Sequence, residues 1–191
     1  MLKKVFPLSL LACFISISSA LGGTPTKAEN FTLPDYNGVK HSLSDYKDAK
    51  AIVVMFIATQ CPVSNSYNER MVSLYNDYTP KHVSFIGINS NKQESAEEVK
   101  HHAEEHGFKF TVLKDDKNVI ADKFGATVTP EIYVIEPSTL KILYHGRIDN
   151  AMREAKVTSH DLRTALDEIL SDKPVAVTET KAFGCTIKKI D

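Results

Sequence analysis

The chain has 191 residues, 42% of them hydrophobic and 25% charged, with a formal net charge of −1. This length and composition predict one soluble globular domain that buries a sizeable core. Because the charge is nearly balanced and no basic cluster is present, nucleic acid is excluded as an electrostatic partner.

Residues 1–20 have the layout of a secretory signal peptide. Lys3 and Lys4 precede an apolar run over residues 5–17, and small residues follow up to Ala20. The run is too short for a membrane span, so we expect export to a bacterial periplasm or out of the cell. Two alternatives stay open. A lipobox-like stretch could place a lipid on Cys13, although the apolar run continues past it, or the segment could remain as an N-terminal helix.

Cys61 and Cys185 are the only other cysteines of the chain. Signal-peptide cleavage or lipidation of Cys13 would leave them as the only free thiols. An exported protein meets an oxidising compartment, where two thiols form a disulfide or a redox pair.

The first half of the chain predicts strands that alternate with helices. Residues 21–29 read as a flexible lead-in, and a domain is expected over residues 30–173. Asn37-Gly38 predicts a turn between two short strands. The unbroken apolar run 51–57 predicts a central strand buried on both faces. Apolar residues at helical spacing then predict a helix over 67–78, which ends before Pro80.

The second half continues the alternation and ends in an irregular tail. Further strands are expected at residues 83–88, 110–113, 132–135 and 142–144, the last two as an antiparallel hairpin, and a short helix at residues 119–124. Ser95 and Glu98 form a capping box for one helix, and Thr158 with Asp161 predicts the cap of the last. Residues 174–191 lack periodicity and carry Cys185. The elements together predict an α/β fold, a mixed central sheet flanked by helices.

Cys61 lies where the buried strand hands over to a helix. The free N–H groups and partial positive charge of a helix N-terminus stabilise a thiolate, the reactive form of cysteine. Pro62 suits the first helical position, and Ser64 is expected to cap the helix or donate its hydroxyl to the sulfur. The alternative is that Cys61 is only a small buried hydrophobe.

A second candidate element is Thr129-Pro130, immediately before a strand. A proline is awkward inside a central strand, but a cis Thr-Pro bond forms a sharp turn at its start. Together with the strand-cysteine-helix unit upstream, it suggests a cis-proline loop beside Cys61.

These motifs carry a resemblance to known proteins. The order strand, "ATQCPVS", helix and "TPEIYVI" resembles a thioredoxin-fold protein. The opening "NFTLPDYNGVKHSLSDYK" resembles the alkyl hydroperoxide reductase/thiol-specific antioxidant branch. The closing "GRIDN", "DLRTALDEIL" and "FGCTIKK" resemble its peroxiredoxin-like 1 group. The resemblance covers residues 30–188, nearly all of the expected mature chain.

The resemblance implies roles for three residues. Cys61 corresponds to the reactive thiol, Pro130 to the cis-proline beside it and Cys185 to the C-terminal cysteine of the group. Two departures narrow the expected activity. Ser64 stands where thioredoxins have their second cysteine and where peroxiredoxins have their peroxidatic cysteine. Ala58 lies three residues before Cys61, whereas peroxiredoxins have a threonine or serine three residues before their peroxidatic cysteine. Classical peroxide reduction is therefore not expected.

The resulting hypothesis is an exported thiol–disulfide oxidoreductase or antioxidant protein without a cofactor or metal. Cys61 would attack a protein or small-molecule disulfide or sulfenate, and an unidentified donor would supply electrons. Three fates of Cys185 stay open: a resolving thiol for Cys61, a bond to another chain, or a free thiol. A weak thiol peroxidase and a non-catalytic binding module are the alternative functions.

Two further patterns are read as structural. His102 to His106 formally matches a zinc-protease pattern, but its highly charged helix is typical of a solvated face. Arg147 could approach the sulfur and stabilise a thiolate, yet a pairing with Asp149 or the surface is the simpler expectation.

Overall fold

A computed structural model of the protein describes residues 25–190. The expected signal peptide at residues 1–20 and the alternative lipidation site Cys13 lie outside the described residues. Within residues 25–190, no helix is both long and apolar enough to cross a membrane.

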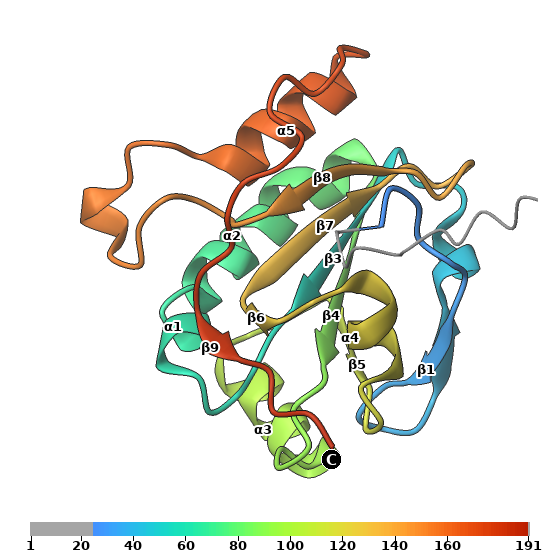
Figure 1. The fold of residues 1–191 in the computed structure, drawn as a ribbon, viewed down its shortest axis with the longest axis vertical. Coiled ribbons are helices and arrows are strands. Elements are labelled where there is room, and N and C mark those ends of the chain that lie inside the picture. The colour runs from blue at the N-terminus through green and yellow to red at the C-terminus, as the bar shows by residue number, and fades with distance from the viewer. Residues whose placement is uncertain (1–24, 191) are drawn as a thin grey trace, which may run out of the picture.

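A five-stranded mixed sheet forms the centre of the molecule (Figure 1). Its order is β5-β4-β3-β7-β8, with β3, β4 and β5 parallel and β7 and β8 antiparallel to their neighbours. The strands are β3 (Ala51–Phe56), β4 (Val83–Asn89), β5 (Thr111–Lys114), β7 (Glu131–Ile135) and β8 (Ile142–Gly146). This arrangement confirms the expected α/β class and thioredoxin-like fold.

Helices cover both faces of the sheet, which is why β3 is buried along its whole length. Val53 and Met55 face the layer of α2 (Asn68–Tyr78), α3 (Ala96–Glu105) and α5 (Asp161–Leu170). Ile52 and Phe56 face the opposite layer, which contains α4 (Val119–Phe124). Successive strand residues point to opposite faces, so an unbroken apolar run satisfies both layers.

The N-terminal hairpin packs on the α4 side of the sheet. β1 (Thr32–Pro34) and β2 (Lys40–Ser42) pair antiparallel around the expected Asn37-Gly38 turn, and the 3-10 helix η1 (Leu43–Tyr46) follows. Residues 26–28, which belong to the expected lead-in, make backbone hydrogen bonds with residues 140–142 at the start of β8. These bonds cover part of that sheet edge.

The predicted cap of α3 is correct and the predicted cap of α5 is wrong. Ser95 and Glu98 exchange the two hydrogen bonds of a capping box at 3.2 and 2.7 Å. The hydroxyl of Thr158 instead accepts a hydrogen bond from the side chain of Asn150 at 2.7 Å, and α5 begins three residues later with His160 at its N-cap. Thr158 therefore stabilises the loop before α5 through Asn150 and does not cap the helix.

The C-terminal tail returns to the sheet (Figure 1, red). It leaves α5, and its strand β9 (Cys185–Thr186) pairs antiparallel with β6 (Val128–Thr129). The short elements that remain are α1 (Pro62–Asn65), η2 (Thr79–Lys81) and η3 (Glu154–Lys156). β9 also contacts α1, so the tail lies between the first helix and β6.

Phe124 on α4 should be a major contributor to stability. It is 2% exposed and makes edge-to-face contacts with Phe31, Phe56 and Tyr133. Phe124→Ala should lower the free energy of unfolding by about 3–5 kcal/mol in urea denaturation, because it leaves a cavity. Val119→Ala on the same helix should change it by less than about 0.5 kcal/mol, since Val119 is 47% exposed. Equal effects of the two substitutions would contradict this view of the core.

Candidate active site

Cys61 is the N-cap residue of α1. Its backbone is extended, and its sulfur accepts a hydrogen bond from the backbone N–H of Ser64 at 3.3 Å. Pro62 occupies the first helical position, where a missing N–H costs nothing. Cys61 is only 3% exposed, so its sulfur lies at the helix N-terminus but beneath other residues.

Cys61 is joined to Cys185 by a disulfide. The two residues are 124 positions apart in the chain, and their Cα atoms are 5.9 Å apart. Of the three fates left open for Cys185, the structure contains the intramolecular bond. Cys185 itself is partly exposed.

Thr129 and Pro130 lie against both cysteines. Their peptide bond is cis. Thr129 is the β6 partner of Cys185, and its carbonyl oxygen is 3.4 Å from the sulfur of Cys61. The structure thus brings together Cys61, Ser64, Thr129, Pro130 and Cys185, drawn from three separate parts of the chain.

Ser64 acts differently from one sequence expectation. Its hydroxyl oxygen accepts a hydrogen bond from the backbone N–H of Ala58 at 3.2 Å. The contact of Ser64 with the sulfur is made by the backbone N–H. The side chain of Ser64 therefore stabilises the loop between β3 and α1, and its backbone N–H is the group that binds the Cys61 sulfur.

Glu131, directly after Pro130, holds the cis-proline loop, and the sequence analysis missed it. Its carboxylate accepts hydrogen bonds from the backbone N–H groups of Thr127 and Val128 at 2.8 and 3.1 Å and contacts His145 Nε2 at 2.7 Å. Burial raises the pKa of Glu131, but these hydrogen bonds outweigh it and hold the pKa below the ordinary value of 4.5. The sequence did contain a signal for this role, because Glu131 is a charged residue at the start of an apolar strand.

Glu94 holds the loop before Cys61 in the same manner and was also missed. It is 1% exposed and accepts hydrogen bonds from the backbone N–H groups of Thr59 and Gln60 at 2.8 and 3.0 Å. The side chains of Asn89 and Asn91 donate to the same carboxylate. The sequence signal was the polar stretch at residues 89–94, directly after a buried strand.

The tail is packed tightly before Cys185. A side chain on Gly184 would place its Cβ 1.9 Å from the carbonyl oxygen of Thr129, so only glycine fits at this point. The ring of Phe183 contacts the ring of Tyr67 edge-to-face, with centroids 6.3 Å apart. These contacts bring the tail close to the cis-proline loop and to α1.

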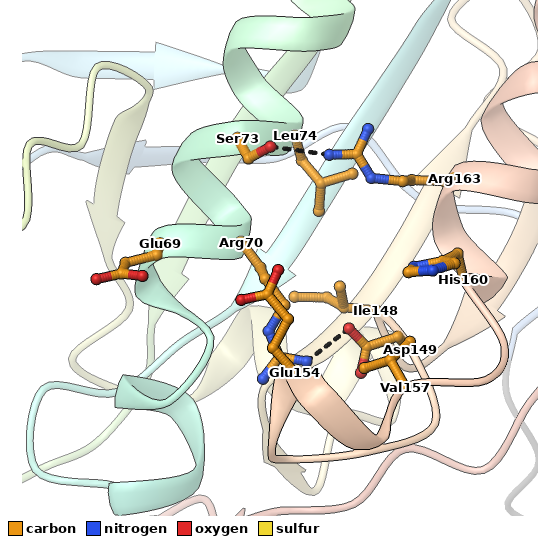
Figure 2. Close-up of a pocket in the computed structure, with 10 residues that line it drawn as sticks. All are labelled: Glu69, Arg70, Ser73, Leu74, Ile148, Asp149, Glu154, Val157, His160 and Arg163. Carbon is orange, nitrogen blue, oxygen red and sulfur yellow. Dashed lines mark hydrogen bonds and ion pairs between the residues drawn. The ribbon is translucent and has the colours of Figure 1, made fainter.

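Tyr67 also contacts a buried ion pair. Figure 2 shows this pair, Arg70 and Asp149, where it lines a pocket. The hydroxyl of Tyr67 donates to Asp149 at 3.1 Å, and Arg70 binds the other oxygen of Asp149 at 2.6 Å. Burial and the Asp149 charge raise the pKa of Tyr67 well above its usual range, which keeps the hydroxyl a donor. The pocket, of about 270 Å³, lies between α2, the loop after β8 and α5, and neither cysteine lines it.

The two patterns read as structural lie outside this cluster. Arg147 pairs with Asp161 at 2.8 Å, because its expected partner Asp149 is bound by Arg70. The ring of His102 lies 4.3 Å from that of His106 on α3. Burial and His106 lower the pKa of His102, which favours its neutral form.

Comparison with models of protein families places the chain in one family. The model of the AhpC/TSA family matches residues 25–150. The chain belongs to the AhpC/TSA family. The match includes Cys61 and the cis-proline loop, whereas Cys185 lies beyond it.

Individual relatives carry two kinds of name, peroxiredoxin and thiol-disulfide oxidoreductase. The Mycobacterium tuberculosis (strain H37Rv) protein named "Putative peroxiredoxin Rv2521" is 28% identical over 70% of this chain and 87% of its own length. Thiol-disulfide oxidoreductase ResA of Bacillus thuringiensis is 29% identical over 58% of this chain and 62% of its own. The crystal structure of SMc02350 from Sinorhizobium meliloti 1021 superposes with a TM-score of 0.81, at 32% identity, over 88% of this chain and 95% of that one.

The tight fit at Gly184 should control the disulfide. Gly184→Ala forces the tail away from the carbonyl oxygen of Thr129, so the equilibrium constant for forming the Cys61–Cys185 bond in a glutathione buffer should fall about tenfold or more. Thr186→Ala, an exposed change in the same strand, should leave the constant within about twofold. An unchanged constant in Gly184→Ala would show that the tail does not depend on this contact.

Glu131 should make stability depend on pH. Because its folded pKa is depressed, its contribution is present above the ordinary value of 4.5 and is lost as pH falls through the folded pKa. Glu131→Gln should be less stable than the natural protein by roughly 1–3 kcal/mol at pH 7, since a neutral amide weakens the charge-assisted hydrogen bonds to the loop N–H groups and removes the ion pair with His145. The difference, measured by urea denaturation, should shrink below pH 4.5. A difference that stays constant on acidification would contradict this role, and exposed Glu104→Gln is the control.

Proposed function

We propose that the protein is an exported thiol–disulfide oxidoreductase that cycles between a Cys61–Cys185 disulfide and two thiols. The observation that carries the proposal is the position of the bond, with Cys61 at a helix N-terminus and Cys185 on the strand beside the cis-proline loop. The peroxiredoxin-like and thiol–disulfide oxidoreductase relatives supply the reaction class.

Reduction of the disulfide begins at Cys185. Cys61 is 3% exposed and Cys185 partly exposed, so a donor thiolate attacks the sulfur of Cys185. The S–S bond breaks, and its electron pair passes to Cys61, which leaves as a thiolate stabilised by the Ser64 N–H. The second thiol of the donor then attacks the mixed disulfide and releases Cys185. The donor dithiol is oxidised by two electrons, and the protein takes them up.

The reduced protein passes these electrons to a substrate. The Cys61 thiolate attacks a substrate disulfide and expels one substrate thiolate, with Thr129 and Pro130 positioning the substrate backbone beside the sulfur. Cys185 then attacks Cys61, releases the second substrate thiolate and restores the disulfide. With a sulfenate substrate, the first attack expels hydroxide, which leaves as water, and the rest of the sequence is the same.

Export is part of the proposal because the disulfide needs an oxidising compartment. A disulfide persists in the periplasm or outside the cell, whereas cytosolic reductants keep thiols reduced. The signal-peptide pattern of residues 1–20 supports the same compartment.

Substitution of each cysteine should give a different defect. Cys61→Ser should abolish dithiothreitol-driven reduction of a disulfide peptide, because the attacking sulfur is gone. Reduced Cys185→Ser, freed of dithiothreitol and mixed with the disulfide peptide, should instead accumulate a mixed disulfide between Cys61 and the peptide, visible by mass spectrometry. Thr186→Ala is the matched control and should turn over normally. Normal turnover by Cys185→Ser without trapped intermediate would refute the resolving role.

The two other candidate functions have their own readouts. A weak thiol peroxidase would consume peroxide with the same donor faster than it reduces the peptide. A non-catalytic binding module would show Cys61 of the reduced protein reacting with iodoacetamide at neutral pH no faster than free cysteine.

A further inference from the structure

The loop between β4 and α3 touches both halves of the redox site. Glu94 at its end binds the loop that leads into Cys61, through the N–H groups of Thr59 and Gln60. Asn91 in the same loop binds the tail beyond Cys185, since its Oδ1 accepts the backbone N–H of Lys188 at 2.7 Å. The β4–α3 loop thus binds both the segment before Cys61 and the segment after Cys185.

Glu94 and Asn91 are joined to each other within this loop. The Nδ2 of Asn91 donates to Oε1 of Glu94 at 2.9 Å, and both residues are at most 5% exposed. A continuous series of hydrogen bonds therefore runs from Gln60, next to Cys61, through Glu94 and Asn91 to Lys188, three residues after Cys185. None of its links involves either sulfur, so the series does not require the disulfide.

The chemistry at position 94 calls for a carboxylate. Each of its oxygens accepts one backbone N–H and one asparagine Nδ2: Oε1 from Gln60 and Asn91, and Oε2 from Thr59 and Asn89. A glutamine would present an NH₂ group to one of these pairs of donors and leave them unpaired in a buried site.

The tail has further attachments on both sides of Cys185. Upstream, the N–H of His145 donates to the carbonyl of Thr178 and the carbonyl of His145 accepts from the N–H of Thr180, both at 2.9 Å along the edge of β8. Downstream, the N–H of Ile187 donates to the carbonyl of Thr127 at 2.9 Å, and the carbonyl of Lys188 accepts from Lys92 at 2.9 Å. Cys185 therefore lies between two attachments that involve neither sulfur.

We propose that Asn91 and Glu94 are positioning residues that keep the reduced Cys185 within reach of Cys61, so that the disulfide reforms rapidly after each turnover. Fixing two groups next to each other makes their reaction intramolecular and raises their effective concentration. This proposal rests on the proposed exchange between the two cysteines and assigns its speed and equilibrium to the β4–α3 loop.

The test measures the equilibrium constant for forming the Cys61–Cys185 bond in a glutathione buffer. Alkylation of free thiols followed by mass spectrometry gives the oxidised fraction of the natural protein and of each variant. Asn91→Ala should lower the equilibrium constant for the Cys61–Cys185 bond about tenfold or more. Lys188→Pro, which removes the N–H that Asn91 binds and leaves Asn91 itself unchanged, should lower it similarly, and Glu94→Gln should also lower it. Lys189→Ala removes an exposed ion pair with Asp122 farther along the tail and should leave it within about twofold.

A double-variant cycle separates positioning from general destabilisation. Asn91→Ala and Lys188→Pro remove the same link, so the double variant should lower the constant no more than the stronger single variant. Constants within about twofold of the natural protein for both single variants, or effects that multiply in the double variant, would overturn the proposal. If Asn91→Ala fails to fold, Lys188→Pro alone decides, because it alters only the tail. The buffer contains no disulfide peptide, so failure to reduce that peptide would refute the proposed function independently.

Discussion

The candidate active site depends on the antiparallel pairing of β9 with β6. Cys61 and Cys185 are separated by 124 residues, and only the return of the tail to the cis-proline loop brings their sulfurs together. The pairing is short, but Gly184 lets the tail approach the carbonyl of Thr129 closely, and the N–H of Ile187 adds a bond to Thr127. Backbone hydrogen bonds of this kind fix the strand register and therefore the position of the sulfur.

Two buried carboxylates perform matching tasks on either side of this pairing. Glu94 accepts two successive backbone N–H groups of the loop before Cys61, and Glu131 accepts two from the loop before Pro130. Loops at strand ends leave amides without a sheet partner, and a buried amide without an acceptor costs about 1–3 kcal/mol. The carboxylates remove that cost. Glu94 fixes the loop that leads into Cys61, and Glu131 fixes the loop whose Thr129 carbonyl oxygen lies 3.4 Å from the Cys61 sulfur.

Because Ser64 stands where a Cys-x-x-Cys motif has its second cysteine, the sulfur that pairs with Cys61 comes from another part of the chain. In a Cys-x-x-Cys protein, both sulfurs lie on one helical turn. Here the partner sulfur lies on the tail, 124 residues away in the chain, where backbone contacts with the β4–α3 loop and with β8 hold it independently of the disulfide. The position of the second sulfur therefore depends on the loop contacts of the tail.

Several features were determined by the sequence alone. The fully apolar run of β3, the helical spacing of α2 and the Ser95 capping box identify the elements, and Cys61 and Thr129-Pro130 mark the candidate site, because each depends on neighbours close in the chain. Thr158 was assigned a cap wrongly because its hydroxyl turned to Asn150 within the loop. Tertiary structure alone decided the partner of Cys61, the need for glycine at position 184 and the roles of Glu94 and Glu131. The disulfide, the fit of Gly184 and the hydrogen bonds of Glu94 join segments far apart in the chain, and the bonds of Glu131 to Thr127 and Val128 follow from the conformation of one loop. Hydrophobic periodicity predicts none of these contacts.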